Sequence, residues 1–140
     1  MQTNTIFHKI LSGEMPCHKV YEDEDFLVIL DVFPTHLGHS LIIPKHAAKN
    51  IYELDENSAS KIFPLAQKIA RVVQEATGCQ GINILQNNGA AAEQTVFYFH
   101  MHIIPRFEGD GIVMKRPTNR FGGEDFEGMA RNLAQALHIK

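Results

Sequence analysis

The chain has 140 residues, 44% hydrophobic and 21% charged, which indicates one soluble globular domain rather than a disordered or fibrous protein. Its net charge of −3 provides no basic field, so a nucleic-acid polymer is not expected as a partner. Because Cys17 and Cys79 form no CxxC motif, and no signal peptide or apolar span of roughly 18 residues is present, we expect a cytoplasmic protein with reduced thiols and no membrane contact.

Short periodic segments predict a helix followed by three strands in the first third of the chain. Apolar residues at helical spacing in residues 6–11 stop at Ser12-Gly13, which predicts a short helix ended by turn residues. Residues 18–22, 26–31 and 39–44 are rich in Val, Ile, Leu and Tyr and are separated by turn residues. This pattern predicts an antiparallel meander.

Residues 55–77 carry the longest helical pattern of the chain. Apolar side chains recur at i, i+3, i+4 and i+7 from Ile62 to Val73, and Gly78 stands where a C-terminal cap belongs. Pro64 falls inside the pattern and would remove one backbone hydrogen bond. We therefore expect either a kink at Pro64 or a helix that begins near it.

The second half of the chain predicts two more strands and a terminal helix. We expect strands over residues 81–87 and 95–104, a loop of small residues over 88–93, and a helix around Met129 to Leu137. The segment 108–128 is expected either to be mobile or to lie against a neighbouring subunit. Together these elements predict an α+β domain with its helices on one side of a five-stranded antiparallel sheet.

The fifth strand holds the most reactive side chains. Alternation along a strand puts Tyr98, His100 and His102 on one face and Phe99 and Met101 on the other. Two imidazoles two residues apart lie roughly 7 Å apart along a strand, close enough to contact one phosphate group together. The same alternation is also typical of a half-buried strand whose polar face is merely solvated. Residues elsewhere must decide between these interpretations.

Residues 39–45 (HSLIIPK) and 94–106 (QTVFYFHMHIIPR) together resemble the histidine triad (HIT) family of nucleotide hydrolases and transferases. The resemblance runs from residue 5 to residue 106 and includes Asp31 before a Pro-containing loop, and Asn87 and Gly89 before Gln94. It implies a HIT-like fold over residues 1–140, with 1–106 as the core and 107–140 as a C-terminal loop and helix. It also implies a homodimer whose sheet continues across a two-fold axis.

The resemblance implies an enzyme that needs no cofactor. The family's strand carries three histidines at alternate positions, which match Tyr98, His100 and His102, so the first is missing here. The middle histidine, the nucleophile, matches His100, and the third, which contacts the phosphate, matches His102. A neutral imidazole attacks phosphorus and gives an intermediate that water then cleaves. His39 and His102, when protonated, would stabilise charge on the phosphate oxygens.

Further contacts to a purine nucleotide follow from the same resemblance. Gln94 is expected among the catalytic residues and, with Thr95, beside the scissile phosphate or its leaving group. Asn87 is expected on the phosphate side, and Asp31 at the ribose hydroxyls. Tyr98 belongs to the substrate-contacting positions as well. The expected apolar contacts to the base are Ile6, Phe7, Ile10, Ile29, Val32 and Leu41.

Bacterial members of the family often hold a structural zinc ion at four positions, which in this chain are Thr5, His8, Ala47 and Tyr98. Zinc in structural sites takes four nitrogen or sulfur ligands, and only His8 among these residues can supply one. The comparison therefore implies that the metal site has been lost and that the protein binds no metal. His46 is either a substitute ligand or a surface histidine.

Three functions remain open on the sequence alone. The first is hydrolysis of a purine nucleoside phosphoramidate, or of a related anhydride such as a dinucleoside polyphosphate, through a nucleotidyl-His100 intermediate. The second is a nucleotide-binding regulator with little turnover, which is favoured if Tyr98 distorts His100. The third is a metal-dependent hydrolase with zinc on His39, His100 and His102.

Overall fold

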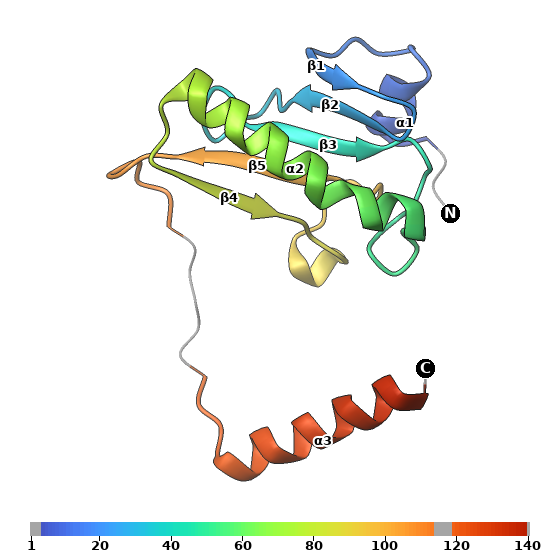
Figure 1. The fold of residues 1–140 in the computed structure, drawn as a ribbon, viewed down its shortest axis with the longest axis vertical. Coiled ribbons are helices and arrows are strands. Elements are labelled where there is room, and N and C mark those ends of the chain that lie inside the picture. The colour runs from blue at the N-terminus through green and yellow to red at the C-terminus, as the bar shows by residue number, and fades with distance from the viewer. Residues whose placement is uncertain (1–3, 114–118, 140) are drawn as a thin grey trace. The chain divides into compact units, whose positions relative to one another are not determined.

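The structure is a computed structural model that describes residues 4–113 and 119–139. The chain divides into two compact units, Met1–Asp110 and Gly111–Lys140. The first unit has the predicted α+β architecture, built on a five-stranded antiparallel sheet (Figure 1). No helix among the described residues is long and apolar enough to cross a membrane.

The sheet has the strand order β1-β2-β3-β5-β4, so β5 lies between β3 and the edge strand β4 (Figure 1). The strands are β1 (Lys19–Glu22), β2 (Phe26–Leu30), β3 (Ser40–Pro44), β4 (Gly81–Leu85) and β5 (Met101–Arg106). Leu41 of β3 pairs with His102 of β5. This register brings His39, which immediately precedes β3, close to the histidines at the start of β5.

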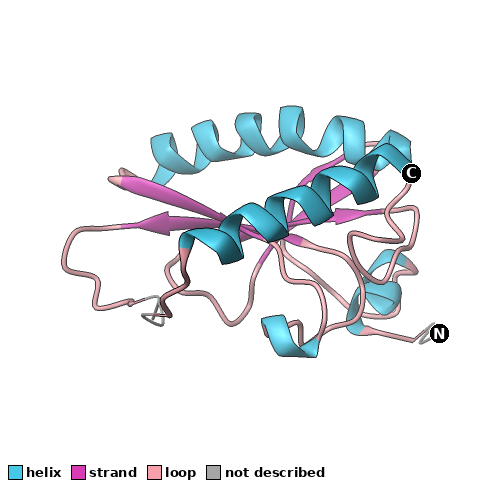
Figure 2. Ribbon diagram, turned by 90° about the horizontal axis from the view of Figure 1, so that it is seen from below, coloured by secondary structure: helices cyan, strands magenta, loops and turns pink. Residues whose placement is uncertain are grey.

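Helices α1 (Ile6–Leu11) and α2 (Glu56–Thr77) cover opposite faces of the sheet, so the expectation that the helices lie on one side is wrong (Figure 2). The reason lies in β2, whose first four residues are all buried. Phe26 and Val28 join the core beneath α2, whereas Leu27 and Ile29 join the core beside α1. A strand that is apolar on both faces requires a cover on both.

Both helices begin and end at residues that satisfy their backbone. Thr5 caps α1 in a reciprocal capping box with His8, and Asp55 caps α2 by accepting a hydrogen bond from the Ser58 N–H. Gly78 ends α2 in the left-handed conformation at φ 68°, as predicted. Pro64 lies well inside α2, so the alternative in which the helix begins at this proline is wrong.

Strand β5 begins at Met101 rather than at Thr95, so the predicted start of the fifth strand is wrong. If the register with β3 continued, Pro44 would stand opposite Phe99, and Pro44 has no N–H to donate. The Phe99 N–H donates instead to the Ala48 carbonyl at 2.7 Å. The predicted alternation nevertheless holds from Tyr98 onward, because Tyr98 packs beside α1 whereas Phe99 and Met101 pack beneath α2.

The second unit contains helix α3 (Gly123–Ile139), which confirms a terminal helix but begins inside the segment expected to be a loop. Residues 114–118 of that segment lie outside the described residues. Glu124 and Asp125 in the first turn match the positive end of the helix dipole. Its apolar side chains are exposed in this unit, namely Phe126, Met129, Leu133 and Leu137.

Candidate active site

A cavity of about 340 Å³ lies among α1, the end of β2 and the segment that leads into β5. Its volume is within the range of small-molecule sites. It is lined by all six apolar residues expected around a base, namely Ile6, Phe7, Ile10, Ile29, Val32 and Leu41. Asp31, Thr95, His100 and His102 contribute polar groups to the same cavity. Sequence reasoning missed other lining residues, namely Met15, Pro16, Cys17, Leu30, Phe33 and Val96.

His100 has one ring nitrogen fixed by the backbone. Its Nδ1 lies 2.7 Å from the Tyr98 carbonyl, which can only accept, so Nδ1 carries the proton and Nε2 has the lone pair. Burial lowers the pKa of His100 below its usual value, although the Tyr98 carbonyl and Asp31 act in the opposite direction. The ring is therefore neutral near pH 7, the form in which an imidazole is a nucleophile.

His39 and His102 form a directed hydrogen-bond chain. The Thr35 backbone N–H donates to His39 Nδ1 at 3.1 Å, so the neutral His39 ring carries its proton on Nε2. This proton faces His102 Nδ1 at 2.8 Å. His102 Nδ1 is thus an acceptor, which puts the His102 proton on Nε2. The Thr35 N–H thus determines the tautomer of His39, and His39 determines the tautomer of His102.

Both rings of this pair are held in the neutral form. Burial lowers the pKa of His102 to about 4, with smaller contributions from His100 and His39. Burial also lowers the pKa of His39, against the opposing charge of Asp31. The protonated forms, which would put positive charge beside phosphate oxygens, are therefore disfavoured in the protein without substrate. The two rings present N–H donors rather than full positive charges.

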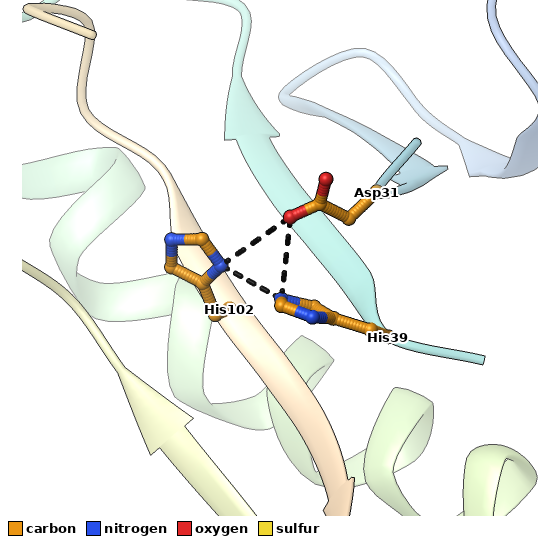
Figure 3. Close-up of side chains that lie close together, drawn as sticks. All are labelled: Asp31, His39 and His102. Carbon is orange, nitrogen blue, oxygen red and sulfur yellow. Dashed lines mark hydrogen bonds and ion pairs between the residues drawn. The ribbon is translucent and has the colours of Figure 1, made fainter. Parts of the chain in front are cut away.

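Asp31 lies beside this pair at the end of β2 (Figure 3). Its Oδ2 is 3.4 Å from His39 Nε2 and 3.9 Å from His102 Nδ1. Its Oδ1 accepts a hydrogen bond from the Phe33 N–H at 2.9 Å, which fixes the start of the loop that follows. The carboxylate therefore has both a turn-forming contact and a place in the cavity wall.

Asp31, His39 and His102 are also spaced closely enough to share a metal ion, with ligand atoms within 4.8 Å of one another. A histidine that ligates a metal through one nitrogen normally donates an N–H from the other. In His39 the other nitrogen accepts the Thr35 N–H instead, so the proton sits on Nε2, where the metal would bind. The hydrogen bonds therefore oppose a metal on His39 and weaken the case for a metal-dependent hydrolase.

Gln94 does not line the cavity, contrary to its expected place beside the phosphate. Its side chain is buried, and its Oε1 accepts the Gly89 N–H at 2.8 Å. Its Nε2 donates to the carbonyls of Lys49 at 2.8 Å and Val96 at 3.1 Å. The amide thus uses its donors and acceptor to hold the loop before His100. Asn87 is likewise absent from the cavity lining.

Tyr98 lies beneath the cavity rather than in its wall, so its place among the substrate contacts is not supported. The side chain is 1% exposed, and its hydroxyl donates to the Pro44 carbonyl at 2.6 Å. Its ring packs edge-on against His8 and Phe7. Burial raises the pKa of Tyr98 to about 12. Tyr98 therefore ties the segment before His100 to β3 and α1.

The resemblance matches Thr5, His8, Ala47 and Tyr98 to the family's zinc-ligand positions, and contacts join three of these residues. Thr5, His8 and Tyr98 are neighbours, and the His8 Nδ1 lies 2.9 Å from the Thr5 hydroxyl and 3.2 Å from the Thr5 N. Within residues 4–113 and 119–139, no cluster of His, Cys, Asp and Glu around His8 or His46 has metal-binding spacing. These residues do not fit a structural zinc ion.

Comparison with known proteins identifies the family. Residues 12–109 match the HIT domain. The chain is 41% identical over 137 residues to Protein hit of Bacillus subtilis, and the aligned residues make up 96% of this chain and 94% of that protein. It is 35% identical over 133 residues to adenosine 5′-monophosphoramidase hnt1 of Schizosaccharomyces pombe, over 94% of this chain and 97% of that protein. A crystal structure of a HIT family protein from Bacillus anthracis gives a TM-score of 0.87 at 40% identity, over 97% of this chain and 99% of that one. The chain therefore belongs to the HIT domain family.

Proposed function

We propose that the protein hydrolyses a purine nucleoside phosphoramidate, or a related nucleotide anhydride, through a covalent nucleotidyl-His100 intermediate. One observation carries this proposal: the Tyr98 carbonyl holds the Nδ1 proton of His100 and leaves the Nε2 lone pair for attack in a ring that lines the cavity. The Schizosaccharomyces pombe relative is named as an adenosine monophosphoramidase, which supports this substrate class.

The proposed reaction has two displacements at the same phosphorus. His100 Nε2 bonds to the α-phosphorus while the bond from phosphorus to the leaving amine breaks, and the amine takes up a proton. Water then attacks the phosphorus, the bond to Nε2 breaks, and a nucleoside monophosphate is released. The ring is positively charged while it carries the nucleotide, and the Tyr98 carbonyl stabilises that charge through the Nδ1 proton.

The remaining residues of the cavity have proposed binding roles. His102 supplies an N–H to the phosphate oxygens, and His39 keeps His102 in the ring form that can do so. Asp31 accepts hydrogen bonds from the ribose hydroxyls, and Thr95 lies near the phosphate. The base lies among the six apolar side chains named above, where burial of its faces contributes to the binding free energy.

Turnover of adenosine monophosphoramidate in EDTA tests the function. We expect hydrolysis without added metal. We also expect kcat/KM to rise with pH until His100 has lost its proton, which happens below the usual histidine pKa, and to stay constant at higher pH. This direction follows because burial lowers the His100 pKa and only the neutral ring attacks. Tight binding without turnover would favour the regulatory function instead. Activity that appears only after metal is added would favour the metal-dependent one.

We infer that the contacts of Tyr98 replace the stabilisation that zinc gives to relatives. Tyr98→Phe is expected to lower the free energy of unfolding by about 1–2 kcal/mol, because the buried Pro44 carbonyl loses its hydrogen-bond donor. Urea unfolding measures this change, and Tyr52→Phe, at a side chain that is 87% exposed, is the matched control. Added zinc is expected to stabilise neither variant. A zinc-dependent rise in the stability of the native protein would contradict the inference.

We also infer a homodimer in which the sheet continues through β4. β4 is the last strand of the sheet, and an uncovered edge strand readily pairs with another chain. A hollow of about 660 Å³ between α2 and β4 is lined by Phe63 and Ile84, which are 61% and 44% exposed. Light scattering is expected to give about twice the 15.8 kDa of one chain.

A further inference from the structure

The loop between β2 and β3 sets the tautomers of two active-site histidines. The N–H that Thr35 donates to His39 Nδ1 comes from this loop, four residues before the ring that accepts it. If this N–H moves away, nothing in the hydrogen-bond chain forces the proton of His39 onto Nε2. The His39–His102 hydrogen bond could then reverse, and His102 would no longer have to carry its proton on Nε2.

The loop is tied to the end of β5 through His36. His36 Nε2 lies 3.2 Å from Asp110 Oδ2, and the ring packs edge-on against Phe107 with centroids 5.1 Å apart. The His36 side chain is 26% exposed and the Asp110 side chain 5%. Because a carboxylate oxygen can only accept, the His36 Nε2 must be the donor.

The Asp110 carboxylate is held in place by several hydrogen bonds. Its two carboxylate oxygens accept hydrogen bonds from the Arg106 guanidinium at 2.7 and 2.9 Å. Its Oδ2 also accepts the Phe107 N–H at 3.1 Å. Such a two-point contact between a guanidinium and a carboxylate is geometrically specific. The acceptor that meets His36 is therefore held in one place by the end of β5.

Short backbone contacts transmit the position of His36 to His39. The His39 N–H donates to the His36 carbonyl at 3.0 Å, and the His39 carbonyl accepts the Asp31 N–H at 2.9 Å. Gly38, between them, has φ 105°, and a Cβ on it would lie 2.8 Å from the Thr77 side chain. The loop is thus closely packed against Thr77 at Gly38, and the contact of His36 with Asp110 anchors the part of the loop that contains Thr35.

We propose that His36, held by Asp110, is a positioning residue that keeps the Thr35 N–H against His39 and so sets the tautomers of His39 and His102. Neither His36 nor Asp110 lines the cavity, so both act through His39 rather than on a substrate. The effect on turnover rests on the proposed hydrolysis. The tautomers themselves are a property of the protein without substrate and can be measured separately.

Two variants of His36 separate its hydrogen bond from its packing. His36→Gln keeps an N–H donor within reach of Asp110, whereas His36→Leu fills a similar volume without a donor. Two-dimensional ¹H–¹⁵N NMR of the histidine rings in the full chain is expected to show protonated Nε2 in His39 for the native protein and His36→Gln. A mixture of tautomers is expected for His36→Leu. His46→Ala, at an exposed histidine, is the control and should match the native protein.

Kinetics with adenosine monophosphoramidate gives the second measurement. His36→Leu is expected to lower kcat about tenfold with KM within about twofold, because the substrate contacts remain while the donors lose their orientation. His36→Gln should restore most of kcat. Should His36→Leu fail to fold, Asp110→Ala removes the acceptor of the same hydrogen bond and is expected to give the same mixture of tautomers. Native tautomers and native kcat in His36→Leu would overturn the proposal, as would equal losses in the Gln and Leu variants.

Discussion

His100→Ala is expected to lower kcat by about 10⁴-fold or more, because the variant lacks the nitrogen that bonds to phosphorus in the proposed reaction. The apolar cavity and Asp31 remain in the variant, so KM should change much less than kcat. The fold should also persist, since Phe99 and Met101 on either side of His100 keep their packing beneath α2. Steady-state kinetics on adenosine monophosphoramidate measures both constants.

His46→Ala is the matched control for this variant, because it removes an exposed histidine that follows β3 and lies outside the cavity lining. Its kcat should equal that of the native protein. Thermal unfolding of His100→Ala should remain cooperative, which excludes misfolding as the cause of lost activity. If His100→Ala retained kcat within about tenfold of the native value, another group would have to be the nucleophile.

His102→Leu is expected to lower kcat by about 10²–10³-fold, because charge that develops on the phosphate oxygens loses an N–H donor inside a buried site. The same change removes the His102 nitrogen that accepts the Nε2 proton of His39 at 2.8 Å. The His39 ring then loses the hydrogen bond that orients it. Kinetics at pH 7 measures the loss. Because the pKa of His102 is lowered to about 4, the ring is neutral at pH 7 and offers an N–H donor without a positive charge.

His102→Gln distinguishes a lost donor from a lost side-chain shape. Its amide can donate toward the phosphate, so its kcat should lie between those of the native protein and His102→Leu. An identical loss in both variants would mean that the donor is not what His102 contributes. A loss confined to KM would assign His102 to substrate binding alone.

The residues of the apolar cavity wall were expected from the resemblance to the HIT family, whereas local periodicity predicted the helix and strands that carry most of them. Ile29 and Leu41 lie on two strands that were predicted as part of a meander, and in the structure they stand opposite each other and line the cavity. The short helix that supplies Ile6 and Ile10 was predicted from its spacing and its turn residues. These features depend on neighbours in the sequence, which a single chain makes visible.

The roles of the buried polar side chains were not predictable, because their partners are backbone or carboxylate groups far away in the sequence. The Tyr98 hydroxyl donates to the Pro44 carbonyl, and the Gln94 amide donates to the carbonyls of distant Lys49 and nearby Val96. His36 meets Asp110 across 74 positions, and nothing local marks that contact. The predicted start of β5 at Thr95 was wrong for a similar reason, because the residue that ends its pairing with β3 is Pro44, which lies on that other strand.

The intact mass of the protein, rapidly quenched during turnover of adenosine monophosphoramidate, decides whether a nucleotidyl-His100 intermediate forms. Covalent catalysis by His100 predicts a fraction of the native chain carrying one adenylyl group, with the adduct located on His100 and absent from His100→Ala. Product formation with no adduct on any histidine, at quench times from the first turnover to steady state, would rule out covalent catalysis, because water would then attack the substrate directly.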